Sequence, residues 1–197
     1  RDAKLAPQGH DKINWVIEHM PVLNSLNKEF LKTKPLAGIN MVVTVHLEAK
    51  TAYLCMVMKN AGANVVVTGS NPLSTQDDVA AALAEHGVGV FAWYNTTQEE
   101  YDQFLHHALD TKPHIIIDDG GDLVSLLHGE RADLAANVMG GSEETTTGVL
   151  RLRALAAQGR LKFPMISVND ADCKHLFDNR YGTGQSVWDG IMRTTNL

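Results

Sequence analysis

Cysteine is scarce in this sequence, and an export signal is missing. Cys55 and Cys173 are the only cysteines in 197 residues, too few for the disulfide framework of a small secreted domain. Cys55 lies inside an apolar run at 52–58, which predicts a buried, reduced thiol. No signal-peptide pattern precedes the first helical stretch. We therefore expect a cytoplasmic protein.

Basic clusters and long hydrophobic runs are missing as well. The formal net charge is −6, and no basic cluster exceeds short pairs such as Lys32 and Lys34, so we expect no nucleic-acid partner. The longest apolar run is far shorter than the ~20 residues of a membrane span, so we expect no membrane partner. The histidines other than His46 are scattered without the spacing of metal ligands, and we expect no metal site.

The sequence does contain enough apolar residues for a packed core, because 44% of it is hydrophobic and only 20% is charged. Residues 11–33 read as two helices that are broken at Met20-Pro21. After them, short runs rich in β-branched residues recur, and most end in Gly, Ser, Asn or Asp. These predicted strands lie within 39–47, 64–70, 88–94, 114–121, 137–142 and 163–170.

Helical stretches alternate with these runs. Continuous apolar strands that alternate with helices indicate a mostly parallel sheet covered on both faces. The sequence therefore predicts an α/β fold of three layers, α/β/α, with a mostly parallel, Rossmann-like sheet and right-handed crossovers. The predicted helices lie at 49–61, 75–86, 97–109, 122–128 and 144–158.

Polar residues follow the predicted strands, and ligands of such folds bind beyond the carboxyl ends of the strands. Each polar segment has an ordinary structural interpretation when it is taken alone. Asp118-Asp119-Gly120-Gly121 suits a turn with a helix N-cap. The acids and threonines at 142–147 suit a capping box formed by Ser142 with Glu144 or Thr145. Lys174 and Asp178, four residues apart, suit a solvated ion pair on a helix.

Taken together, these segments resemble one family. The strings DDGGDL at 118–123, SEETTTG at 142–148 and NDADCKHLFDNRYG at 169–182 occur in the order of the S-adenosylhomocysteine hydrolase (adenosylhomocysteinase) family, in its substrate-binding domain. The upstream strings MPVL at 20–23 and SNPLSTQDD at 70–78 resemble the same family, so the likeness covers essentially the whole chain.

The resemblance implies a thioether hydrolase of the methyl cycle. In this family NAD oxidises the ribose 3′-hydroxyl, a base removes the 4′ proton, homocysteine leaves from the 5′ carbon, and water adds before the ketone is reduced again. The implied partners are a nucleoside thioether, homocysteine and a purine nucleoside. The site must therefore supply an acid that binds hydroxyl groups, a proton acceptor and a cation that exchanges protons.

The resemblance also implies a role for each matched residue. Glu144 is expected to bind the ribose hydroxyls, and Lys174, beside Asp178, to exchange the 3′-hydroxyl proton. Asp119 matches the acid near the 4′ and 5′ carbons, and His46 the histidine that assists the 5′ leaving group. His46 would otherwise be read as a satisfied histidine at a strand end. The expected contacts with NAD come from Thr145, Thr146, Thr147 and Asn179.

The purine-reading segment departs from the usual family pattern, His-x-Thr-x-Gln or Glu-Thr. Here it contains His46, Glu48, Lys50 and Thr51. The ammonium group of Lys50 only donates hydrogen bonds and cannot accept one from the 6-amino group of adenine, whereas a 6-oxo purine would suit it. This variant resembles the branch of the family associated with S-inosylhomocysteine. The alternative is that Lys50 pairs with Glu48 or faces solvent. Thr183, where many relatives have Cys, carries no implied change.

The resemblance further predicts the domain organisation. Residues 1–180 form the substrate-binding domain, with its N-terminal helical segment at 11–33, and residues 181–197 begin a connecting helix toward an NAD-binding domain. No GxGxxG motif of that domain occurs in the chain, so residues 1–197 alone are expected to be inactive. The complete family member is expected to be a homo-oligomer, a tetramer as in the family. The competing interpretation is a catalytically silent nucleoside-binding module.

Overall fold

The structure, a computed structural model, describes residues 2–196 and contains a parallel sheet of six strands in the order β3-β2-β1-β4-β5-β6. The chain builds the sheet outward from β1 in one direction and then from β4 in the other. The carboxyl ends of β1 and β4 therefore flank the point where the strand order reverses. The strands are β1 (Asn40–Thr44), β2 (Asn64–Thr68), β3 (Gly89–Phe91), β4 (Ile115–Asp118), β5 (Gly140–Glu143) and β6 (Met165–Ser167).

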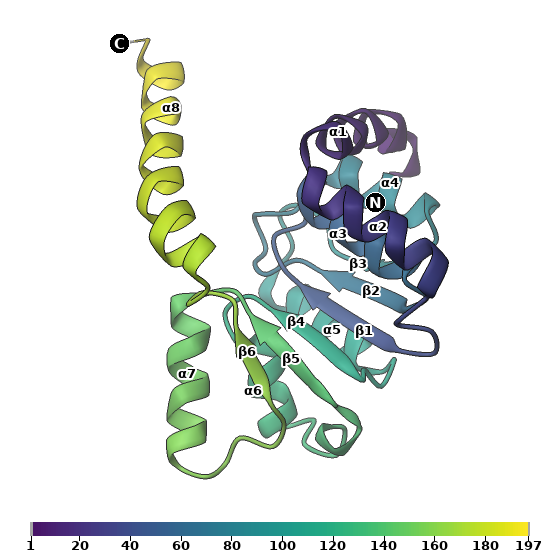
Figure 1. Ribbon diagram of the computed structural model, residues 1–197, viewed down its shortest axis with the longest axis vertical. Helices are drawn as coiled ribbons and strands as arrows, with labels where there is room; N and C mark the ends of the chain where they lie inside the picture. Colours follow the sequence, from purple (N-terminus) through teal and green to yellow (C-terminus); the bar gives the residue numbers. More distant parts are fainter. Residues whose placement is uncertain (1, 197) are drawn as a thin grey trace.

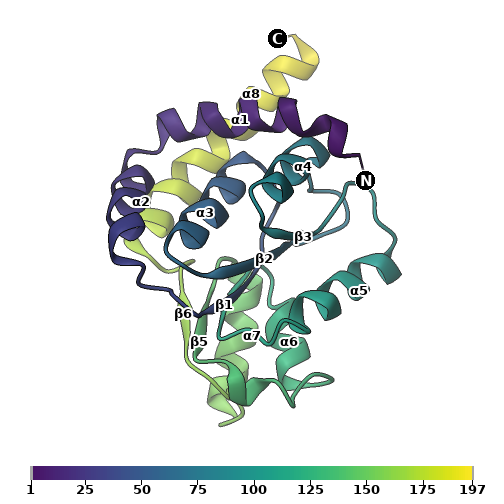
Figure 2. The ribbon, with the colours of Figure 1, turned by 90° about the vertical axis from the view of Figure 1, so that its right-hand side faces the viewer.

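Helices cover the sheet on both faces, which confirms the predicted three-layer α/β/α fold. Figure 2 shows α1 to α4 on one side of the sheet and α5, α6 and α7 on the other. The helices are α1 (Ala6–His19), α2 (Pro21–Thr33), α3 (Ala49–Asn60), α4 (Asp77–Glu85), α5 (Gln98–Leu109), α6 (Asp122–His128), α7 (Thr146–Ala157) and α8 (Thr183–Thr195), with short 3₁₀ turns η1 (Ala3–Leu5) and η2 (Ala135–Asn137) and the π-helix η3 (Cys173–Gly182).

Two apolar clusters form the core, one on each face of the sheet. Val43 and Val67 pack with α1, α3 and α4, whereas Val42 and Ile116 pack with α5 and α6. Successive residues of a strand point to opposite faces, so strands that are apolar throughout serve both clusters. Cys55 is fully buried in the first cluster, and burial raises the pKa of its thiol to about 12. This confirms the predicted buried thiol.

The predicted helices are present, with shifted ends. The break at Met20-Pro21 is confirmed, because Pro21 begins α2. The first of these two helices begins at Ala6 rather than at residue 11, with a proline in its first turn. Thr97 and Glu100 form a capping box that starts α5. No helix in the described part of the chain is both long and apolar enough to cross a membrane.

The prediction for residues 137–147 was wrong in its details. The strand β5 runs to Glu143, and α7 begins at Thr146 instead of at residue 144. The N-cap is Thr145, whose Oγ1 accepts a hydrogen bond of 3.0 Å from Gly148 N, so Ser142 does not cap this helix. The reason is register: Glu143 pairs with Asp118 on β4, which extends the strand by one residue.

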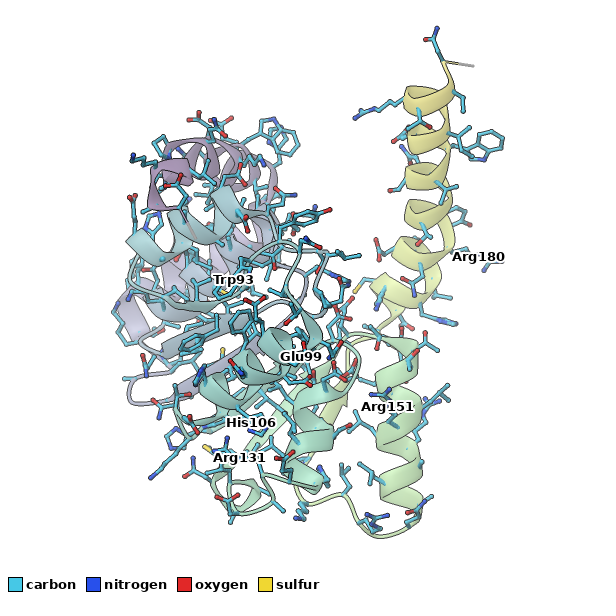
Figure 3. The ribbon with its side chains drawn as sticks, turned by 180° about the vertical axis from the view of Figure 1, so that it is seen from behind. Trp93, Glu99, His106, Arg131, Arg151 and Arg180 are labelled. Carbon is cyan, nitrogen blue, oxygen red and sulfur yellow. The ribbon has the colours of Figure 1, made fainter. Side chains whose placement is uncertain are left out.

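The C-terminal helices leave the body of the domain. Figure 1 shows α8 extending away from the sheet beyond β6 and α7, with the C-terminus at its far end. Apolar side chains on η3 and α8 remain exposed, among them Phe177, Tyr181 and Trp188. Figure 3 shows Arg180 projecting from this segment away from the sheet, whereas Arg151 of α7 lies beside α6.

Candidate functional site

The candidate site lies at the carboxyl ends of β1, β4 and β5, where the loops after these strands meet. These loops carry most of the residues that the sequence predicted to be functional. The side chains at this edge fall into four groups, which are His46 with Asp119, Glu48 with Lys50, the buried acids Asp118 and Glu143, and Lys174 with Glu144.

His46 and Asp119 face each other across the point where the strand order reverses, between the ends of β1 and β4. The Nε2 atom of His46 lies 3.5 Å from Oδ2 of Asp119, and its Nδ1 atom lies 3.0 Å from Oγ of Ser70. The Asp119 side chain is 4% exposed and that of His46 is 52% exposed. The acid is therefore held in a low-dielectric position, whereas the imidazole faces the open side of the site. Such a pair can exchange a proton with a bound ligand.

Glu48 and Lys50 form a second group at the start of α3. Oε1 of Glu48 accepts hydrogen bonds from the backbone N–H groups of Lys50 (3.0 Å) and Thr51 (3.1 Å), and Glu48 thus caps the helix. Oε2 of Glu48 lies 3.2 Å from Nζ of Lys50, so the two side chains are paired, as the simpler interpretation predicted. The Lys50 side chain is nevertheless 66% exposed, beside a cleft of about 540 Å³ between α1 and α3. Its ammonium group can therefore also reach a ligand.

Asp118 and Glu143 are two buried acids beneath the site. They occupy paired positions at the ends of β4 and β5, and both are 0% exposed. The two oxygens of Asp118 accept hydrogen bonds from the N–H groups of Asp119 (3.0 Å) and Val124 (2.9 Å). Asp118 therefore fixes the turn that carries Asp119. Sequence reasoning assigned no role to Glu143, and the only available signal was its place directly before Glu144.

Burial raises the pKa of Asp118 to about 8; the N–H groups of Val124 and Asp119 oppose this shift, and Glu143 and Asp122 add to it. A carboxyl group with a raised pKa binds its proton more tightly in the folded state, so its stabilising contribution is lost as the pH rises. We expect the contribution of Asp118 to the free energy of unfolding to fall as the pH rises from 3.8 to about 8. This fall should be absent in Asp118→Asn.

Denaturant titrations of the wild type and of Asp118→Asn over this pH range measure the effect. Charged groups remote from Asp118 contribute equally to both curves and cancel in the difference. Stability curves that run parallel for the two proteins would show that Asp118 titrates at its ordinary pKa.

Lys174 and Glu144 form the fourth group. Nζ of Lys174 lies 2.8 Å from Oε1 of Glu144 and also donates to the backbone carbonyl of Glu144. The Lys174 side chain is only 12% exposed, whereas that of Glu144 is 40% exposed. A largely buried cation is thus held against a carboxylate that can also accept hydrogen bonds from hydroxyl groups of a ligand.

In the described residues Lys174 pairs with Glu144 and no ion pair joins it to Asp178, so the expected place of Asp178 beside Lys174 stays a prediction. Lys174 stands in the first turn of η3 and is drawn inward by Glu144. Asp178 and Asn179 lie one turn further along, where the helix leaves the domain, and both are exposed. The structure therefore brings His46, Asp119, Glu144 and Lys174 to the site edge, but not Asp178 or Asn179.

The threonines at the start of α7 offer hydroxyl groups on the same side as Glu144. Oγ1 of Thr145 is occupied, because it donates to Glu143 (2.8 Å) and accepts from Gly148. Thr146 and Thr147 are exposed, and Oγ1 of Thr146 donates to Asn169. Hydroxyl groups at a helix N-terminus suit the polar groups of a dinucleotide, so Thr146 and Thr147 fit a cofactor contact better than Thr145 does.

No cluster of three or more His, Cys, Asp or Glu side chains that could hold a metal ion occurs between residues 2 and 196. The polar side chains that the site does present are carboxyl groups, an imidazole and an ammonium group. These are the groups that hold hydroxyls and move protons.

Comparison with known proteins finds one matching family model and a set of similar curated proteins. Residues 1–139 and 129–182 match the family model described as S-adenosyl-L-homocysteine hydrolase. The whole chain is 56% identical to an S-inosyl-L-homocysteine hydrolase of Methanococcus maripaludis, of which it covers 48%. It is 57% identical to an adenosylhomocysteinase of Thermococcus kodakarensis, of which it covers 47%. The chain thus spans about half the length of the curated relatives it matches.

Proposed function

Because this chain belongs to the S-adenosyl-L-homocysteine hydrolase family, we propose that it is the substrate-binding part of an enzyme that hydrolyses S-inosylhomocysteine or S-adenosylhomocysteine. The observation that carries the proposal is the meeting of two proton-transfer pairs at one edge of the sheet, His46 with Asp119 and Glu144 with Lys174. Residues from four separate segments form these pairs. Such convergence is what a site for a polar, multi-step reaction requires.

The two pairs suit different parts of a nucleoside thioether. Glu144 is proposed to accept hydrogen bonds from the ribose hydroxyls, and Lys174 to exchange the 3′-hydroxyl proton. Asp119 is proposed to lie near the 4′ and 5′ carbons, with His46 assisting the homocysteine leaving group. Asp178 is proposed to approach Lys174 only when η3 is held by further structure, because it is exposed in the present arrangement.

NAD, when bound, supplies hydride removal from and return to the 3′ carbon. We propose that Thr146, Thr147 and Asn179 contact it, with Thr145 acting as the cap that orients the two neighbouring threonines. The chain itself contains no GxGxxG motif for the pyrophosphate, so most of the cofactor contacts are proposed to come from a dinucleotide-binding domain of the full-length protein. Residues 1–180 are proposed as the substrate-binding domain and 181–197 as the start of the connection.

The exposed Phe177, Tyr181 and Trp188 support this organisation, because an apolar helix face of this kind is normally covered. The full-length protein is proposed to be a cytoplasmic homo-oligomer.

Steady-state assays of both thioethers with NAD test the proposal, using residues 1–197 alone and the full-length protein. We expect turnover only by the full-length protein. Nucleoside binding without turnover by the full-length protein would instead favour the second candidate, a catalytically silent nucleoside-binding module.

Lys50 is proposed to select the purine. Its ammonium group would donate to the 6-oxo group of hypoxanthine, whereas the 6-amino group of adenine would face it donor against donor. An unmade hydrogen bond of this kind costs about 1–3 kcal/mol, which corresponds to roughly a ten- to hundredfold difference in kcat/KM. We expect S-inosylhomocysteine to be the better substrate. In Lys50→Gln, whose amide can donate or accept, the preference should shrink or invert.

Measuring kcat/KM for both substrates on the wild type and on Lys50→Gln tests the role of Lys50. Lys59→Gln is a matched control, because Lys59 stands at the far end of α3, where its Nζ donates to Gly87 O at 2.7 Å. Equal use of both purines by the wild type, unchanged in Lys50→Gln, would mean that Lys50 does not read the base.

A further inference from the structure

Glu143 connects the loops that carry the proposed catalytic residues. Its Oε1 atom accepts three hydrogen bonds, from Gly120 N (2.8 Å), Thr145 N (2.9 Å) and Thr145 Oγ1 (2.8 Å). Gly120 directly follows Asp119 in the turn after β4, and Thr145 directly follows Glu144 in the turn before α7. A single carboxyl oxygen therefore joins the two turns.

The position of this carboxyl group is strongly constrained. Glu143 is 0% exposed, and its Oε2 atom is buried without a hydrogen-bond partner among residues 2–196. Burial of a carboxyl group is costly, so the hydrogen bonds to Oε1 are needed to hold it there. Gly148 leaves the space for the group, because a Cβ atom at position 148 would lie 2.1 Å from Cδ of Glu143.

The backbone repeats the same connection. Glu144 N donates to Asp118 O at 3.0 Å, which completes the ladder between β4 and β5 beyond their last paired residues. On the side of α7, Arg151 donates to Gly120 O at 2.9 Å. Gly120 has a φ of +119° and is free to follow these constraints because it has no side chain.

We propose that Glu143 is a positioning residue that fixes the distance between Asp119 and Glu144, and so allows both to engage one ribose ring. This inference rests on the proposed function of the site. Glu143 itself is buried beneath the site and acts through Gly120 and Thr145. Catalytic groups need to be held within fractions of an ångström, which loops achieve only when a rigid partner supports them.

The experiment measures ribose recognition in the full-length protein. The dissociation constants of inosine and 2′-deoxyinosine are determined by calorimetry, and their ratio reports the contact of Glu144 with the ribose hydroxyls. For the wild type we expect a preference for inosine of about tenfold or more, as for a hydrogen bond to a charged group. In Glu143→Ala we expect the ratio to fall toward one.

Two further variants separate positioning from folding. Glu143→Gln keeps an acceptor oxygen in the place of Oε1 and should retain most of the wild-type ratio. Gly148→Ala keeps Glu143 but displaces its carboxyl group, so it should also lower the ratio. This variant tests the inference even if Glu143→Ala does not fold. Leu83→Ala, at a fully buried position in α4, is the control for destabilisation alone and should keep the ratio.

A wild-type preference for inosine that persists in folded Glu143→Ala or Gly148→Ala would overturn the inference and leave the proposed function intact. An equal loss in Leu83→Ala would also overturn it, because destabilisation alone would then explain the effect. A wild type that binds both nucleosides equally would contradict the proposed role of Glu144, and the inference would fail with it.

Discussion

Lys174→Ala is expected to lower kcat of the full-length protein by about 10²–10⁴-fold, the usual contribution of a general acid–base group. The reason is the position of its ammonium group, which is nearly buried and held 2.8 Å from Oε1 of Glu144, the proposed ribose ligand. A residue that exchanges a proton during the reaction contributes mainly to the rate. The affinity for the nucleoside should therefore change much less than kcat.

Steady-state kinetics and nucleoside binding, measured on the same preparation, check this expectation. Lys28→Ala serves as the matched control, since Lys28 is exposed on α2, away from the site, and its loss should change neither quantity. If Lys174→Ala kept more than about a tenth of the wild-type rate, proton exchange would have to be assigned to another group.

Asp119→Asn is expected to reduce kcat by a similar factor, about 10²–10⁴. Asparagine has nearly the same shape, so the backbone hydrogen bond from Asp119 N to Asp118 and the fold of the turn should survive. What is lost is the carboxyl group 3.5 Å from Nε2 of His46, which is the acid proposed to lie near the 4′ and 5′ carbons. The variant should bind the nucleoside but exchange its 4′ hydrogen slowly.

Wash-in of solvent deuterium at the 4′ carbon, followed by NMR or mass spectrometry, separates this step from the rest of the reaction. Asp133→Asn, at an exposed position, is the control and should exchange at the wild-type rate. Normal deuterium exchange in Asp119→Asn would place the base elsewhere and leave Asp119 as a partner of His46 only.

The sequence predicted the fold well because the apolar strands and the helices between them carry strong local signals. Runs such as 64–68 and 115–118 are apolar and β-branched, and a buried parallel strand needs little else. The end of β5 was missed for the opposite reason. Residues 140–143 are Gly-Gly-Ser-Glu, with no apolar pattern, and they form a strand because β4 and β6 pair with them on both sides.

The candidate site could be predicted only in part. The resemblance identified His46, Asp119, Glu144 and Lys174, and the structure brings them to one edge of the sheet. The sequence could not reveal that Lys174 pairs with Glu144 instead of Asp178, because the partner of Lys174 depends on where η3 leaves the domain. Nor could the sequence reveal the proposed role of Glu143, which rests on a hydrogen bond from Gly120, 23 residues away along the chain.

The measurement that tests the account most directly compares S-inosylhomocysteine with its 3′-deoxy analogue as substrates of the full-length protein with NAD. Every proposed role of Glu144, Lys174 and Asp119 depends on chemistry that starts at the 3′-hydroxyl. We predict that the ribose compound is hydrolysed to inosine and homocysteine, while the 3′-deoxy analogue binds and is not turned over. Hydrolysis of both compounds at similar rates would contradict the account, since cleavage would then need neither the 3′-hydroxyl nor the groups placed around it.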